Sequence, residues 1–117
     1  MPDNAHFQYN LGVILGALGH KQEAKAAYRR AIALDPTDVQ TLNNLGFLLI
    51  EKDALDEATA LLEQAVNLDG RFAPARFNFG RAMLARGRAA EAKVQFDTAR
   101  RLDARFGEAI DELMKPQ

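Results

Sequence analysis

Asn44-Leu45-Gly46 is the stretch of sequence that decides the fold, because it returns at a fixed interval. Asn10-Leu11-Gly12 lies 34 residues before it, and Asn78-Phe79-Gly80 lies 34 residues after it. The same interval relates further residues: Glu23, Glu57 and Glu91; Ala24, Ala58 and Ala92; Ala31, Ala65 and Ala99; Leu34-Asp35, Leu68-Asp69 and Leu102-Asp103. A period held this strictly is typical of stacked-repeat proteins, in which each unit buries its apolar face against its neighbours.

The composition agrees with one small helical domain. Of the 117 residues, 48% are hydrophobic, and many of these are Ala and Leu, which favour helices. The absence of Cys excludes disulfides and thiolate metal sites, and the presence of only two His argues against a His-rich metal site. There is no apolar run of membrane-spanning length and no secretory signal pattern, so we expect a soluble, cytoplasmic protein without membrane insertion.

The charges nearly cancel but are unevenly distributed. The net charge of −1 argues against nucleic-acid binding. Residues 1–70 contain 5 Lys/Arg and 10 Asp/Glu, whereas residues 71–105 contain 9 Lys/Arg and 3 Asp/Glu. The third repeat is therefore a basic segment on an otherwise acidic chain.

Each repeat is predicted to form two helices. Gln8, Leu11 and Leu15 follow the i, i+3, i+7 spacing of one helical face. Glycine at 19 and 87 suits the left-handed turn at a helix end, and Pro36 stops a helix. We expect helices over 4–18, 21–34, 38–52, 54–67, 72–86 and 89–102, in repeats 5–38, 39–72 and 73–106. Asp3 and Asp53 are candidate N-caps.

A further helix is predicted over residues 105–115, with no second helix after it. Phe106, Ile110, Leu113 and Met114 form an apolar stripe there, between polar residues. This pattern is typical of a capping helix that covers the last repeat with one face and turns the other to water. The alternative is a frayed terminal segment.

Small residues recur inside the predicted helices. A glycine in mid-helix costs about 0.5–1 kcal/mol relative to alanine. This cost is offset if a neighbouring helix backbone crosses closely at Gly12, Gly46 and Gly80. We expect the space between such helices to be filled by large side chains of the second helices, namely Tyr28, Leu62 and Phe96.

These residues resemble the tetratricopeptide repeat (TPR) family, whose pattern is aromatic-x-x-Leu-Gly-x-x-Tyr followed by Ala, an aromatic residue, Ala and Pro. The matching residues are Leu11, Gly12, Ala24, Tyr28, Ala31 and Pro36; Leu45, Gly46, Ala58 and Ala65; and Gly80, Ala92, Phe96 and Ala99. The chain departs from the pattern at three points. The initial aromatic residue is replaced by Gln8, Leu42 and Arg76 in the three repeats, and Leu15 stands in place of the first Tyr in repeat one. Repeats two and three lack the closing proline.

The resemblance implies an all-α fold, a right-handed superhelical solenoid of three TPR helix pairs plus a C-terminal capping helix. It also implies a non-catalytic scaffold that holds a peptide or a partner helix in a concave groove lined by the first helices. The residues expected on that groove are Tyr9, Asn10, Val13, Asn43, Asn44, Phe47, Phe77, Asn78 and Arg81.

Two groups among these residues have an alternative interpretation. Asn10, Asn44 and Asn78 recur once per repeat, and an amide can pair with both the N–H and the C=O of an extended peptide. Such a ladder is similar to that of the O-linked N-acetylglucosamine transferase superhelix. The asparagines could instead bond a neighbouring helix. Tyr9, Phe47 and Phe77 are candidate anchors for a ligand, or they pack within the fold.

Other site types find little support in the sequence. The two-carboxylate clamp of TPR co-chaperones needs Lys, Asn and basic residues where this chain has Tyr9, Val13, Asn44, Pro74 and Asn78, of which only Asn44 fits. We find no phosphate-binding loop, metal-spaced cluster or nucleophile motif, so we expect no enzyme activity and no cofactor.

The leading hypothesis is therefore a scaffold that binds a protein or peptide ligand in the groove. A second hypothesis is self-association, in which the acidic N-terminal half stacks head-to-tail on the basic third repeat of another copy. A third is that the chain is a fragment of a longer TPR protein fused to an enzyme or a secretion component.

Overall fold

The chain folds into consecutive helices that lie side by side. The computed structural model describes residues 4–51 and 54–116, and within these ranges it contains helices and no strand. The elements are α1 (Ala5–Ala17), α2 (Lys21–Leu34), α3 (Val39–Ile50), α4 (Leu55–Leu68), α5 (Ala73–Ala85), α6 (Ala89–Leu102), a short 3-10 helix η1 (Ala104–Phe106) and α7 (Gly107–Leu113). The all-α prediction is confirmed.

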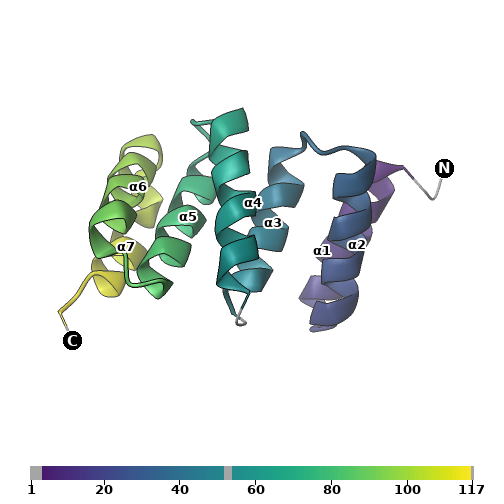
Figure 1. Ribbon diagram of the computed structural model, residues 1–117, viewed down its shortest axis with the longest axis horizontal. Coiled ribbons are helices and arrows are strands. Elements are labelled where there is room, and N and C mark those ends of the chain that lie inside the picture. Colours follow the sequence, from purple (N-terminus) through teal and green to yellow (C-terminus); the bar gives the residue numbers. More distant parts are fainter. Residues whose placement is uncertain (1–3, 52–53, 117) are drawn as a thin grey trace.

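The helices form three hairpins that follow one another along a rod of 47 × 26 × 23 Å (Figure 1). Each hairpin joins two successive helices: α1 with α2, α3 with α4, and α5 with α6. Neighbouring hairpins meet where α2 packs on α3 and where α4 packs on α5. This arrangement is the expected solenoid of helix pairs, while its right-handed superhelical sense stays a prediction.

The helix ends agree with the predicted ranges to within one or two residues, and those of α2 and α6 agree at both ends. The predicted caps Asp3 and Asp53 lie outside the described residues. The first helix is capped by Asn4, whose side-chain oxygen accepts a hydrogen bond from the Phe7 N–H at 2.7 Å. Gly19 and Gly87 have φ values of 85° and 79°, which confirms the predicted left-handed turns.

The recurring aspartates explain how the turn between repeats forms without a proline in the second and third repeats. Asp35, Asp69 and Asp103 each follow a helix in extended conformation. Each side chain accepts a hydrogen bond at 3.0 Å from the backbone N–H two residues later, which is an Asx-turn. The hydroxyl of Thr37 also donates to Asp35, and these bonds hold the pKa of the Asp35 carboxyl below its usual value. The turn is thus built by aspartate in all three repeats.

The recurring glycines make room for side chains of the paired helix. A Cβ on Gly46 would lie 2.7 Å from Leu62 Cγ, and a Cβ on Gly80 would lie 2.5 Å from Phe96 Cε1. Tyr28 covers Gly12 in the same way. The prediction of a helix backbone crossing at these glycines was therefore wrong, because a large side chain of the second helix occupies the space. The recurring alanines of α2, α4 and α6 are fully buried around these side chains.

The C-terminal helix covers the third repeat as predicted for a cap, but it is shorter. The segment expected over 105–115 is η1 followed by α7. Ile110 is buried, and Phe106 and Met114 pack against the core formed by the second and third repeats. Leu113 was expected in the same stripe, but it is exposed.

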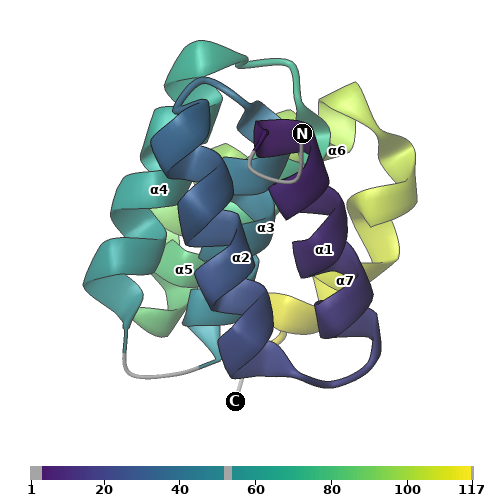
Figure 2. The same cartoon turned by 90° about the vertical axis from the view of Figure 1, so that its right-hand side faces the viewer.

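The first helix pair is attached to the second mainly through α2. α3 packs directly on α5, whereas α1 makes few direct contacts with α3. Two ion pairs also connect α2 to the second helix pair. Lys21 Nζ donates to the Glu51 carboxylate, and Arg29 donates to both carboxylate oxygens of Glu57 at 3.2 Å. Exposed ion pairs contribute little to stability. Figure 2 looks at this end of the rod, with α1 and α2 in front.

The glycine packing predicts opposite effects for two Gly→Ala substitutions. Gly80→Ala should destabilise the fold by about 1–3 kcal/mol, because the added methyl group overlaps the buried Phe96 ring. Gly16→Ala is the matched control, since its Cβ would meet only Ala24 Cβ at 3.9 Å. It should be stabilising by about 0.5–1 kcal/mol. Urea denaturation followed by circular dichroism measures both; equal stabilities would contradict the packing.

Candidate peptide-binding face

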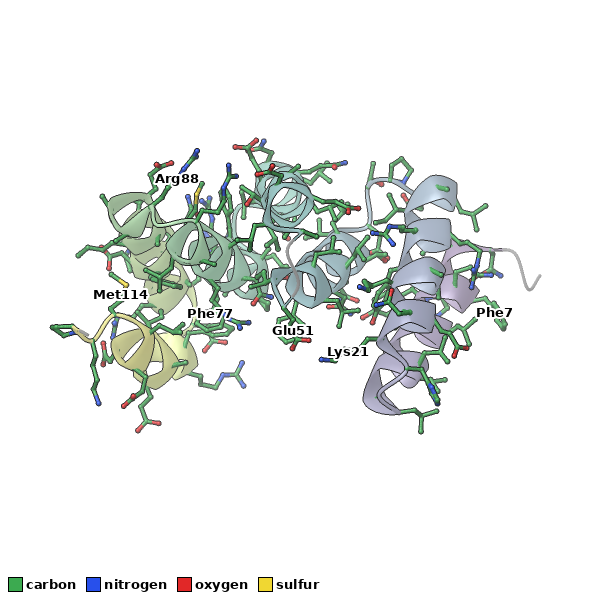
Figure 3. The ribbon with its side chains drawn as sticks, turned by 60° about the horizontal axis from the view of Figure 1, so that its bottom comes forward. Phe7, Lys21, Glu51, Phe77, Arg88 and Met114 are labelled. Atoms are coloured by element: carbon green, nitrogen blue, oxygen red, sulfur yellow. The ribbon has the colours of Figure 1, made fainter. Side chains whose placement is uncertain are left out.

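The predicted site residues lie on α1, α3 and α5, the first helices of the three pairs. We call the side of the molecule lined by these three helices the A-helix face. In Figure 3, the side chains of Phe77 and Glu51 lie along this side, and Arg88 lies on the opposite side. The face has two distinct parts, which follow from how closely its helices pack.

A hollow of about 250 Å³ opens between the first two helix pairs. It is lined by Val13, Gly16, Tyr28, Asn44, Phe47 and Leu48. Val13, Asn44 and Phe47 were predicted for the groove, so the structure brings these three together. The hollow exists because α1 and α3 diverge here, whereas α3 and α5 are in direct contact.

Sequence reasoning missed Tyr28, which was assigned to the core only. Its ring covers Gly12, while its hydroxyl reaches the hollow and accepts a hydrogen bond from Asn44 Nδ2 at 3.4 Å. The sequence did contain a signal for this role. Of Tyr28, Leu62 and Phe96, only Tyr28 has a polar group, and a buried tyrosine hydroxyl usually has a hydrogen-bond partner.

The hydroxyl of Tyr28 remains protonated at neutral pH. Burial raises the pKa of the Tyr28 hydroxyl above its usual value, and the hydrogen bond from Asn44 opposes this only in part. The ring of Tyr9 packs against the ring of Tyr28, with the two ring centroids 6.2 Å apart. The hollow therefore has apolar walls and a neutral polar group, the Tyr28–Asn44 pair, at one point.

Arg81 lies beside the hollow, held against aromatic rings. Its guanidinium carbon is 5.2 Å from the centroid of Phe47 on α3 and 6.0 Å from the centroid of Phe77 on α5. Both distances are in the range of cation–π interactions. Phe47 thus takes part in both features, since it lines the hollow and also contacts Arg81. That Arg81 faces a ligand stays a prediction.

Phe77 is held mainly by contacts within the fold. Its ring stacks on Phe106 with centroids 4.8 Å apart and lies tilted against Phe96 at 5.9 Å. Tyr9 is half-buried, whereas Phe47 is 38% exposed. Of the three aromatic residues expected as ligand anchors, Phe47 is therefore the most exposed to solvent.

The recurring asparagines do not form three equal rungs. Asn78 Nδ2 donates to Asn43 Oδ1 at 2.9 Å, and these residues are 8% and 6% exposed. Asn44 is half-buried, and Asn10 is exposed. The difference has a packing cause: contact of α5 with the preceding α3 joins Asn78 to Asn43, whereas no helix precedes α1 within the described residues, and Asn10 is exposed.

Residues 4–51 and 54–116 contain neither a metal-binding cluster nor a membrane-spanning helix. No group of three or more His, Asp or Glu side chains in these ranges is arranged to hold a metal ion. No helix described there has the length and hydropathy that a membrane crossing requires.

Comparison with known families gives one consistent result. Family profiles described as tetratricopeptide repeat match residues 5–38, 27–60 and 49–115. The last of these alone covers more than half of the chain. No curated protein sequence is similar enough to be recognised as a relative.

Several solved structures share the fold. A crystal structure of MamA superposes with a TM-score of 0.77 at 25% identity, over 91% of this chain and 58% of the MamA chain. YrrB, described as a TPR protein with an unusual peptide-binding site, gives a TM-score of 0.78 at 25% identity, over 86% and 52%. The second TPR of Spaghetti (RPAP3), bound to the HSP90 peptide SRMEEVD, gives 0.81 at 27%, over 85% and 92%. The chain thus spans just over half the length of MamA and YrrB.

Removing an amide of the buried Asn43–Asn78 pair should lower the free energy of unfolding, whereas removing the exposed Asn10 amide should not. Asn43→Ala should destabilise the fold by about 1–3 kcal/mol, because the buried Asn78 amide loses its acceptor. Asn10→Ala should change stability by less than about 0.5 kcal/mol, because Asn10 is exposed. A double-mutant cycle with Asn78→Ala in urea denaturation measures the coupling; additive effects would mean that the two amides do not interact.

Proposed function

The chain belongs to the tetratricopeptide repeat family, and from this premise we propose that it is a protein-interaction scaffold that binds an extended peptide or a partner helix in a concave groove on its A-helix face. The observation that carries the proposal is the juxtaposition of the hollow and Arg81, which share Phe47. A concave apolar site with a few converging polar groups is typical of ligand sites in proteins.

The chemistry of the two parts indicates the kind of segment that would fit. The hollow has room for one apolar side chain between Val13 and Phe47. The guanidinium of Arg81, steadied by the aromatic rings, is suited to a carboxylate, which it can bind through two parallel hydrogen bonds. The preferred ligand is therefore a segment in which an apolar residue lies close to an Asp or a Glu.

The remaining predicted residues take different parts in this proposal. Asn44 lines the hollow and Asn10 is exposed on α1, and in this proposal the amides of both would pair with the ligand backbone. Tyr9 supports Tyr28, and Phe77 supports Arg81. Asn43 and Asn78 hold α3 against α5, so they would act on binding by fixing the groove rather than by touching the ligand.

The similar structures support a binding role in general terms. YrrB is described with a peptide-binding site, and the Spaghetti domain was solved with a peptide. A scaffold of this kind needs no cofactor and no catalytic group. A cytoplasmic location stays a prediction.

Head-to-tail stacking by charge receives less support than groove binding. The basic residues of the third repeat are partly used within the chain. Arg86 pairs with Asp56 at 3.2 Å, and Arg100 pairs with Asp111 at 2.7 Å. Cations that already have a carboxylate partner contribute less attraction toward the acidic half of another copy.

Peptide selection on the whole chain tests the groove. Peptides selected from a random display library on the wild-type chain should bind Phe47→Ala at least tenfold more weakly, a loss of about 1.4 kcal/mol or more. The reason is that Phe47 contributes to both parts of the site. Fluorescence anisotropy measures the affinities, and circular dichroism checks the helix content.

Val94→Ala is the matched control, because Val94 is an exposed apolar residue on α6, outside the A-helix face. It should leave peptide affinity unchanged. Unchanged affinity of the Asn44→Ala/Phe47→Ala double variant would refute the groove assignment, provided that the helix content is retained.

A defined peptide separates this groove from the two-carboxylate clamp. SRMEEVD has apolar residues beside Glu and Asp, so weak binding to the hollow and Arg81 is expected, with a Kd of about 0.1 mM or weaker. The tighter binding of a two-carboxylate clamp is not expected, because Tyr9, Val13 and Pro74 stand at positions where the clamp needs polar and basic groups. Isothermal titration calorimetry measures the affinity, with the Spaghetti TPR domain as a positive control. Micromolar binding that is lost in Arg81→Gln would show that this groove recognises acidic C-termini after all.

A further inference from the structure

The outer side of α1 carries an apolar stripe that the proposed groove does not use. We call Phe7, Leu11, Ile14 and Leu18 the α1 stripe. Phe7, Ile14 and Leu18 are 45%, 56% and 65% exposed, and Leu11 is half-buried. Their spacing of four, three and four residues keeps them on one side of the helix. Figure 3 shows the Phe7 side chain at the N-terminal end of the rod, pointing outward from the molecule.

The internal repeats show what this side of a first helix normally does. The residues 34 positions after Phe7 and Leu11 are Thr41 and Leu45, which are fully buried. The next equivalents, Ala75 and Phe79, are also buried. In α3 and α5 this side therefore packs against the preceding helix pair. In α1, Phe7, Ile14 and Leu18 on this side are exposed, and no helix pair precedes α1 within the described residues.

The size of the residues argues against a further repeat of the same kind as the cover. In α3 and α5, which pack on the preceding helix pair, the residue equivalent to Phe7 is small: Thr41 in α3 and Ala75 in α5. In α1 the same position is Phe7, whose ring would keep a preceding pair at a greater distance. Large apolar residues at alternating intervals of three and four suit direct pairing with another helix.

We propose that the α1 stripe is a dimer interface, on which α1 of a second copy packs antiparallel about a two-fold axis. The spacing reads the same in both directions, so each layer finds an apolar partner in the other copy. Phe7 would meet Leu18, and Leu11 would meet Ile14. The interface is isologous, as expected for a closed dimer, because both copies use the same patch.

The charge distribution supports a second copy in this orientation. α1 contains no Lys, Arg, Asp or Glu, so pairing with itself brings no like charges together. The opposite end of the molecule is a poor cover, because exposed Glu108, Asp111 and Glu112 lie on α7. Two copies would thus join at their N-terminal ends, which differs from head-to-tail stacking.

The contact is small compared with that of permanent dimers. Standard interfaces bury about 800 Å² per partner, and one helix face with four apolar side chains supplies on the order of half of that area. The dimer is therefore concentration-dependent. Because its attraction is apolar, added salt should not weaken it, in contrast to stacking by opposite charges.

Sedimentation velocity on the whole chain tests the interface. The wild-type chain should pass from monomer to dimer as its concentration rises toward about 1 mM, which corresponds to a weak association. Ile14→Glu should remain monomeric under the same conditions. Val94→Glu places the same charge on an equally exposed residue of α6 and should dimerise like the wild type. Circular dichroism checks that each variant is folded.

Cross-linking tests the orientation, and the absence of native Cys makes it specific. A mixture of Phe7→Cys and Leu18→Cys chains should give a dimer of one chain each with a short thiol cross-linker, while Phe7→Cys alone should stay unlinked. Linkage of Phe7→Cys to itself would indicate a parallel pair and overturn the proposed geometry.

Three further outcomes would overturn the interface: a monomer at every concentration, a dimer that persists in Ile14→Glu, or a dimer that salt dissociates. None of these depends on the peptide groove, because the α1 stripe excludes the residues that line the hollow.

Discussion

The packing of one large side chain against one glycine within each helix pair is the constraint on which the rest of the structure depends. Tyr28, Leu62 and Phe96 lie so close to Gly12, Gly46 and Gly80 that a Cβ at any of these glycines would overlap them. This contact fixes how near the two helices of a hairpin approach. Because it recurs every 34 residues, it gives three hairpins of similar geometry and places α1, α3 and α5 on one face.

The candidate site arises where the regular arrangement changes. In the second and third pairs, α3 and α5 touch, and the Asn43–Asn78 bond closes the space between them. Between the first and second pairs, α1 and α3 diverge, and a hollow opens instead. The large residue of the first pair is a tyrosine rather than Leu62 or Phe96, so its hydroxyl supplies a polar group at that opening.

The sequence predicts the contacts within a repeat better than those between repeats. Helix bounds, the left-handed glycines and the buried alanines follow from local signals that recur with the period, and they agree with the structure. The placement of Val13, Asn44, Phe47 and Arg81 on one face follows from helical spacing. The burial of Asn78 and the stacking of Phe77 on Phe106 could not be predicted, because they depend on the distance between successive helix pairs, which a 34-residue period does not encode.

The composition of α1 brings these arguments together. One side must carry Gly12 to receive Tyr28, and another side carries Val13, which lines the hollow. A third side carries Phe7, Ile14 and Leu18, which solvent alone would not favour. In α3, Gly46 receives Leu62 and Phe47 lines the hollow. The third side of α3 is buried, and this burial accounts for its apolar residues. α1 has no such burial within the described residues, and the proposed pairing with α1 of a second copy would cover its outer side.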